Sequence, residues 1–321
     1  KDGVTHERTP LSGDPEGYAT IHLDDCSEFI THSLCGTLYG ADYDTAETAK
    51  YHTDGRHAYI LCRTPLDADV LINIPKMKTH KKTGVTLSLK NMVGINGYRN
   101  CLPHHTIGTP NEGGDEFPES KASNRIQSRS IVGFKKMLVA MGNRGGGVAR
   151  VLMKIGRQIF GDTNEVVRSG NWYGNDTTWR MVLDLNKALF NFNGSGVRRI
   201  KPLKYMTIVD GIVAGDGNGP VSVDAKPCGV VAAGFNPVAV DTVCAAIMGF
   251  DYEKIPMIAN AWKIKDLPLV DFTADEIRCR SNVEGWNGTL DDLHQATHLG
   301  FRPHFGWAGH IERSPANNGR A

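Results

Sequence analysis

The chain of 321 residues carries 36 Lys and Arg against 35 Asp and Glu, and 40% of its residues are hydrophobic. Such a chain is a globular protein of one large or two smaller domains and can bury a sizeable core. The balanced charge argues against nucleic acid or an anionic membrane as a partner, and no apolar run approaches the roughly 18 residues that a membrane helix needs. Seven scattered cysteines and a polar N-terminus predict a cytoplasmic protein without an iron–sulfur cluster.

The first part of the chain alternates irregular and strand-like segments. Residues 1–55 are polar and lack periodicity, so they are predicted to form an irregular N-terminal segment. Two short apolar runs follow, Ala58–Cys62 and Val70–Ile74, and both predict buried strands. A basic stretch, PKMKTHKK, separates the second run from a pattern at helical spacing that predicts a helix over residues 85–93.

An insertion at about residues 100–170 interrupts the core. It begins with a polar loop and continues with two amphipathic helices over residues 131–160, separated by GNRGGG. A helix is then predicted to open at Asp176 as its N-cap. Met206–Val209 and Gly229–Ala233 predict two more strands, and a proline at the first helical position begins a helix over residues 238–248.

These elements predict an α/β core over residues 56–250, flanked by long irregular N-terminal and C-terminal segments. The strands are apolar throughout, which favours a mostly parallel sheet covered by helices on both faces. Residues 251–321 are expected to form an extension of one helix and loops. An open edge of this sheet would invite pairing with a second copy or with another chain.

The basic stretch follows a buried strand directly, at the end where open α/β sheets bind ligands. Lys76, Lys78 and Lys90, with Asn91, are therefore predicted to bind a small molecule that carries a phosphate or a carboxylate. A solvated, lysine-rich surface turn is the alternative. Lys90 and Asn91 favour the binding site, because they lie within an apolar pattern where unpartnered polar groups would be costly.

Four residues are candidates for the chemistry of such a site. His80 or His105 would act as acid and base near neutral pH, and Asp210 and Asp241 would orient the reacting groups. Gly217 lies in the glycine-rich loop VDGIVAGDGNGP, which lets the backbone approach a ligand closely.

Metal binding is a weaker possibility at His104, His105 and Asp115, because their spacing matches no zinc or iron signature. The leading hypothesis is thus an enzyme acting on a small anionic substrate. A non-catalytic binding or assembly protein for an anionic ligand or glycan is the second hypothesis. The third is a metal-dependent redox or isomerising enzyme that uses the histidines. The sequence identifies no cofactor.

Four motifs in this order resemble the bacterial and archaeal family called domain of unknown function 362: ADVLINIPKMKTH, GVTLSLKNMVG, IVDGIVAGDGNGP and GFNPVAVDTVCAAIMG. The resemblance implies an α/β fold and no defined activity. Family members usually have a further N-terminal segment with a Lys-Pro-Asn motif, and many have a ferredoxin-like segment. Neither is found here, which suggests a truncated chain. GNWYGNDTTWRM resembles the longer insertion of some members, and Asn175, Asp176 and Arg180 within it are expected to face the same cleft as the lysines.

Overall fold

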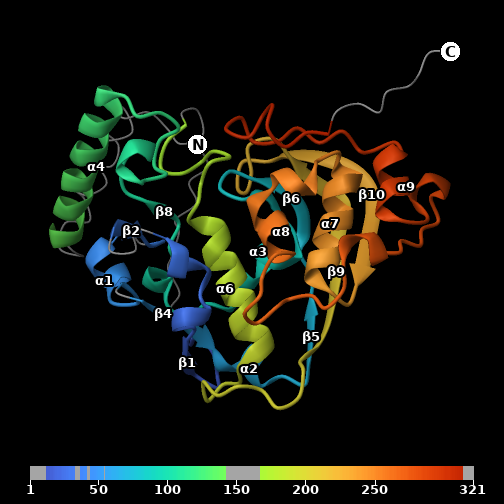
Figure 1. Ribbon diagram of the computed structural model, residues 1–321, viewed down its shortest axis with the longest axis horizontal. Coiled ribbons are helices and arrows are strands. Elements are labelled where there is room, and N and C mark those ends of the chain that lie inside the picture. Colours follow the sequence, from blue (N-terminus) through green and yellow to red (C-terminus); the bar gives the residue numbers. More distant parts are fainter. Residues whose placement is uncertain (1–11, 33–36, 42–43, 54, 142–166, 314–321) are drawn as a thin grey trace, which may run out of the picture.

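The computed structural model describes residues 12–32, 37–41, 44–53, 55–141 and 167–313, and it shows a mixed α/β protein (Figure 1). The described residues form a three-stranded sheet, a five-stranded sheet and one short strand pair. The short pair joins β2 (Leu38–Tyr39) to β8 (His105–Thr106). Helix α6 (Thr178–Asn191) lies between the two larger sheets in Figure 1.

The small sheet is antiparallel and has the order β1 (Tyr18–His22), β4 (Arg56–Cys62), β3 (His52–Thr53). The prediction that Ala58–Cys62 belongs to a parallel sheet is therefore wrong, although the strand itself is confirmed. Its partner β1 lies in the segment predicted to be irregular. Ala19 and Ile21 are buried between exposed neighbours, which is the period of two that a half-buried strand shows.

The main sheet is built around the long strand β9 (Lys204–Asp216). On one side β9 pairs antiparallel with β10 (Asp224–Gly234). On its other side it pairs in parallel with β5 (Val70–Asn73) and then β6 (Lys76–His80), and β7 (Gly84–Thr86) pairs antiparallel with β6. The sheet is mixed because the short loop 217–223 can join β9 to β10 only as antiparallel neighbours.

The helix predicted over residues 85–93 is wrong in its first part. Gly84, at a φ of 77°, turns the chain so that Val85 and Thr86 pair with Thr79 and Lys78 as strand β7. A single turn, α3 (Ser88–Asn91), and the 3₁₀ turn Met92–Ile95 follow. The β-branched residues at 85 and 86 favour the strand once a neighbouring strand is available to pair.

Helix α7 (Pro237–Met248) confirms the predicted helix in that region. Asn236 Oδ1 accepts hydrogen bonds from the backbone N–H groups of Val238 and Ala239, at 2.9 and 3.1 Å. Gly249 ends the helix with a φ of 99°. Helix α7 packs against α3, α8 (Pro256–Ala261) and strand β10, so α7 and the helices beside it cover one face of the main sheet.

Helix α6 is buried along most of its length and ties the N-terminal segment to the core. Asp184 accepts hydrogen bonds from Ser27 Oγ at 2.5 Å, from the Glu28 N–H at 2.7 Å and from Tyr59 Oη at 2.9 Å. Lys187 Nζ lies 2.5 Å from the Glu28 carboxylate. Each buried charge on α6 thus has partners from the first 60 residues, as buried charges require.

Within the described part of the chain, the opposite face of the main sheet is partly open, so helical cover on both faces stays a prediction. Five apolar side chains on it are between 55% and 64% exposed: Val70, Ile72, Ile74, Ile212 and Val231. Val231 pairs across the ladder with Asp210, and Ile72 pairs with Met206, so alternation places these side chains on one face.

The other helices are α1 (Thr45–Ala49), α2 (Arg63–Asp67), α4 (Ala122–Met141) and α9 (Leu290–Gln295). Helix α4 begins earlier than the first helix predicted in the insertion, and the rest of that prediction, over residues 142–160, lies outside the described residues. Among the residues with a described position, no helix is long and apolar enough to cross a membrane.

Candidate functional site: a basic cluster at the β6–β7 hairpin

The hairpin of β6 and β7 and the turn of α3 bring basic side chains together. Lys78 and His80 come from β6, Lys90 comes from α3, and Lys82 and His104 come from neighbouring loops. We call these five residues the basic cluster. Burial is the main cause that lowers the pKa of both His80 and Lys90. The charges of Lys90 and Lys82 lower the pKa of His80 further, and the charge of Lys78 lowers that of Lys90. The five groups therefore share one electrostatic environment.

The glycine-rich loop that follows β9 holds β6 in place. Thr79 Oγ1 donates a hydrogen bond to the Gly217 carbonyl at 2.7 Å, and the Lys81 N–H donates to the Gly219 carbonyl at 3.1 Å. Lys78 Nζ donates to the carbonyl of Pro220 at 3.1 Å. A Cβ atom on Gly219 would lie 1.9 Å from the Thr79 carbonyl oxygen, so only glycine permits this approach. Gly217 thus contributes backbone that supports the cluster.

Asp241 holds the turn that carries Lys90. Its carboxylate accepts hydrogen bonds from the N–H groups of Ser88 at 2.7 Å and Leu89 at 3.0 Å. Burial raises the pKa of Asp241 to about 7, although these two bonds oppose the rise. Asp241 is therefore a positioning group for α3, and its oxygens face the backbone.

Asn91 extends this polar support under the main sheet. Asn91 Nδ2 donates to Asn73 Oδ1 at 2.6 Å, and Asn73 Nδ2 donates to the Ser88 carbonyl at 3.0 Å and to Tyr205 Oη at 2.7 Å. Asn91 thus makes a structural contact to β5, and its role in ligand binding stays a prediction.

Lys90 is the least satisfied charge of the cluster. Its side chain is buried, and burial together with the charge of Lys78 lowers its pKa from 10.5 to about 8. Among the described residues, neither Lys90 nor Lys78 has a carboxylate within ion-pair distance. A buried ammonium without a counter-ion is costly, so the arrangement favours an anion beside Lys90.

Thr86 adds a hydroxyl to the same hairpin. It pairs directly across the ladder with Lys78 and comes four residues before Lys90. Its Oγ1 is buried and makes no hydrogen bond with the described residues. Most buried hydroxyl groups in proteins have a hydrogen-bond partner, so the Thr86 hydroxyl is available to bond to a ligand. Thr86 was not among the residues predicted to bind the ligand, because its position opposite Lys78 depends on the hairpin.

The two histidines of the cluster have defined hydrogen-bonding roles. His80 Nδ1 accepts a hydrogen bond from the Lys82 N–H at 3.1 Å, so the neutral ring carries its proton on Nε2. His104 Nδ1 lies 2.8 Å from the Leu102 carbonyl, which leaves a lone pair on Nε2 when the ring is neutral. Burial is the main cause that lowers the pKa of His80 well below its usual range and that of His104 to about 3.

Other predicted residues have partners of their own. Lys76 forms a half-exposed ion pair with Asp210. His105 is buried, its ring lies 4.8 Å from that of Tyr39, and its Nδ1 is 3.5 Å from Lys82 Nζ. Lys76 and Asp210 thus neutralise each other, and His105 packs beside the loop that Lys82 binds.

The residues predicted from the GNWYGNDTTWRM motif organise the start of α6. The N-cap of α6 is Thr177, so the prediction that Asp176 caps this helix is wrong. Asn175 Oδ1 accepts hydrogen bonds from the N–H groups of Thr177 and Thr178, at 3.1 and 2.7 Å. Asp176 forms an ion pair with Arg180 at 2.9 Å, and Arg180 Nη1 also donates to the Glu28 carbonyl. These contacts give the three residues structural partners, and their role in ligand binding stays a prediction.

Asp115 supports the same region. Its carboxylate accepts from the Thr106 N–H at 2.7 Å, from Thr177 Oγ1 at 2.6 Å and from the Asp176 N–H at 3.0 Å, and burial raises its pKa to about 6. The candidate metal ligands His104 and His105 are not grouped with it, because the described residues contain no set of three His, Cys, Asp or Glu side chains arranged to hold a metal ion.

Comparison with known proteins gives a family and one distant relative. The family model described as domain of unknown function (DUF362) matches residues 32–246. The thylakoid-associated protein sll1697 of Synechocystis sp. (strain ATCC 27184 / PCC 6803 / Kazusa) is 24% identical over 199 residues, which are 62% of this chain and 38% of that protein. This chain therefore aligns with less than half of that relative. No solved structure matches.

Proposed function

The chain belongs to the domain of unknown function 362 family, and we propose that it binds a small phosphate- or carboxylate-bearing molecule at the basic cluster and exchanges a proton with it there. The observation that supports this most strongly is the buried ammonium of Lys90, which lies near Lys78 and has no counter-ion among the described residues. An oxyanion between the two lysines would remove both the repulsion and part of the desolvation cost.

The donors around Lys90 match the oxygens of such an anion. Lys78 and Lys90 present ammonium groups, Thr86 presents a hydroxyl without a partner, and neutral His80 presents Nε2–H. Ionised phosphate and carboxylate oxygens are acceptors and cannot donate hydrogen bonds. A site made of donors is therefore complementary to them. His104 Nε2 is the one acceptor in the cluster, and it would face a hydroxyl or a protonated oxygen of the ligand.

Lys90 is the group best suited to transfer a proton. Its pKa of about 8 lies close to neutral pH, where both protonation states are accessible. His80 and His104 have pKa values too low to hold a proton at neutral pH, and Asp210 is paired with Lys76. We therefore assign the acid–base role first proposed for His80 and His105 to Lys90, with the two histidines of the cluster as hydrogen-bonding partners.

Calorimetric titration with inorganic sulfate and inorganic phosphate, at constant ionic strength, tests the binding. Lys90→Met removes the ammonium and keeps an unbranched side chain, and Thr86→Val removes only the hydroxyl. A charged hydrogen bond contributes about 1.5–3 kcal/mol, so Lys90→Met should weaken binding at least tenfold. Lys76→Met is the matched control, because Lys76 already has a carboxylate partner, and its affinity should stay within twofold. Equal losses in the two lysine variants would contradict the site.

The proton transfer needs a separate test. The native protein would be incubated in D₂O with a panel of phosphate monoesters and hydroxycarboxylates, and reaction would be followed by ¹H and ³¹P NMR. Turnover or C–H exchange that disappears in Lys90→Met supports an enzyme. Tight anion binding with no change in any compound would leave the chain as a binding protein and refute the catalytic part of the proposal.

A further inference from the structure

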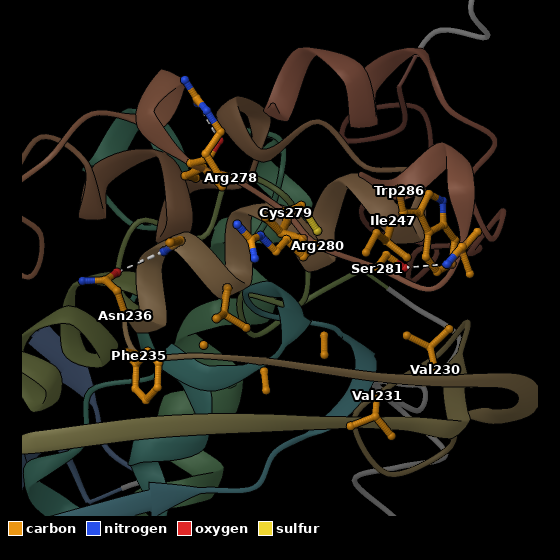
Figure 2. A pocket seen from close by; sticks show the side chains of 18 of the residues that line it. Val230, Val231, Phe235, Asn236, Ile247, Arg278, Cys279, Arg280, Ser281 and Trp286 are labelled. Carbon is orange, nitrogen blue, oxygen red and sulfur yellow. Dashed lines mark hydrogen bonds between the residues drawn. The ribbon is translucent and has the colours of Figure 1, made fainter. Parts of the chain in front are cut away.

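A groove of about 750 Å³ runs along the outer edge of β10, on the side away from β9 (Figure 2). One wall is residues 228–234 of β10 with the two residues that follow, and the other is residues 276–283. Its floor includes Ala239, Val243 and Ile247, which succeed one another every four residues along α7. This volume lies within the range of about 300–1,000 Å³ found for ligand sites.

The β10 wall presents backbone groups that are free to pair. Among the described strands, β10 is hydrogen-bonded to β9 alone, and it stands at the end of the strand order. In an antiparallel ladder every second residue directs its N–H and C=O away from the partner strand. The stretch Val230–Gly234 keeps regular register with β9, so its outward groups are spaced for a further strand.

This edge lacks the features that usually protect a free edge. Charged side chains, proline and bulges prevent unwanted pairing at exposed strands. In β10 the proline is Pro227, and the register shift lies between Pro227 and Val230, before the regular stretch. The stretch itself reads VVAAG and carries no charge. An extended chain can therefore approach all five residues, which span about 17 Å.

The second wall stands apart from β10 instead of pairing with it. Cys279 exchanges backbone hydrogen bonds with Gly288, at 2.8 and 3.0 Å, so this segment is held by its own neighbours. Helix α7 continues under the space between the walls, and Trp286 lies near one end of the groove in Figure 2. A strand added to β10 would thus have apolar side chains of α7 beneath one face.

One positive charge in the groove is available to a ligand. The Arg278 guanidinium donates to the carbonyls of Asp275 and Ile277, at 2.6 and 2.9 Å, and points away from β10 in Figure 2. Glu276 accepts from the N–H and the hydroxyl of Thr273, at 2.7 and 2.8 Å. Arg280 makes no hydrogen bond or ion pair with the described residues, so it is the charge that a carboxylate would meet.

We propose that this groove binds an extended peptide segment of a partner protein, which adds as a strand to the edge of β10 and places an acidic side chain near Arg280. The backbone pairing supplies affinity, and the α7 floor selects apolar side chains at alternate positions. This site is formed by residues outside the basic cluster and is independent of the function proposed there.

An array of acetylated, amidated hexapeptides that alternate valine with threonine or glutamate provides the probes, and fluorescence anisotropy measures their binding to the whole chain. We expect binders that contain glutamate. The tightest binder is then N-methylated on alternate amides in the two possible phases. Only one edge of an added strand faces β10, so one phase should lose at least tenfold in affinity and the other less than threefold. Equal effects in both phases, or no binder up to 1 mM, would overturn strand addition.

Protein variants test the charge separately. Arg280→Gln should weaken the glutamate peptide about fivefold and leave its glutamine counterpart unchanged. Arg278→Gln is the control from the same segment and should change neither by more than twofold. If neither backbone methylation nor Arg280→Gln changes the affinity of a binder, the groove binds an apolar small molecule, which contradicts the proposal.

Discussion

Lys90→Met should make the protein more stable while it weakens anion binding at least tenfold. The Lys90 side chain is buried, and its pKa falls from 10.5 to about 8, mainly through burial. The folded state therefore binds this proton more weakly than the unfolded state does. Methionine has a similar length, contains no charge and adapts to irregular space, so the substitution removes the cost of burying the ammonium.

The size of the effect follows from the two pKa values. A difference of about 2.5 between them corresponds to about 3 kcal/mol of stability. Below pH 8 both states are protonated, and the whole cost is present. Between pH 8 and 10.5 the folded state loses the proton first, so the native protein gains stability with rising pH. Above pH 10.5 both states are neutral and the cost disappears.

Urea unfolding of the native protein and of Lys90→Met, at several pH values and without added anions, measures the difference. The variant should be about 3 kcal/mol more stable at pH 7, and the two proteins should converge as the pH approaches 10.5. Saturating sulfate should stabilise only the native protein, because a ligand that binds the folded state shifts the equilibrium toward it. A variant that is less stable than the native protein at pH 7 would refute the uncompensated charge.

Two further substitutions test the scaffold of the site. Gly219→Ala places a methyl group 1.9 Å from the Thr79 carbonyl oxygen and should lower the free energy of unfolding by about 1–3 kcal/mol or more, measured by thermal or urea unfolding. Gly94→Ala is the control, because no atom lies within 4 Å of the added methyl group, and it should be neutral or slightly stabilising. Similar effects of both substitutions would contradict the close approach. Asn236→Ala removes the cap of α7 and should cost about 1 kcal/mol, and Asn236→Ser, which can still accept from the helix N–H groups, should recover part of it if capping is the cause.

Sequence signals were reliable where neighbours in the chain decide the structure. The Asn-Pro start and the glycine end of α7 are local features, and the helix has the bounds that they predict. The family resemblance rested on four motifs, and the match over residues 32–246 confirms it. The sequence also predicted that a lysine-rich stretch follows a strand, because this depends on the order of residues alone.

The partners of the strands were decided by tertiary structure. Residues 58–62 have the composition of a buried strand in either sheet, and β1, which pairs with them, comes from about 40 residues earlier. Residues 84–86 fit a helical pattern in the sequence, but in the structure they pair with β6 as a strand. Local propensity is a weak preference, and pairing with a neighbouring strand overrides it.

The sequence by itself thus determined the family, the α/β class, helix α7 and the region where positive charge gathers. Only the tertiary structure decided that Lys76 has a carboxylate partner while Lys78 and Lys90 have none among the described residues. Lys76 and the Asp210 with which it pairs are 134 positions apart in the sequence. Asp241 is 153 positions from Ser88, whose N–H it accepts, and this bond positions the turn that carries Lys90. Desolvation and ion pairing depend on which distant segments come together in the fold, and the spacing of residues along the sequence does not show which segments these are.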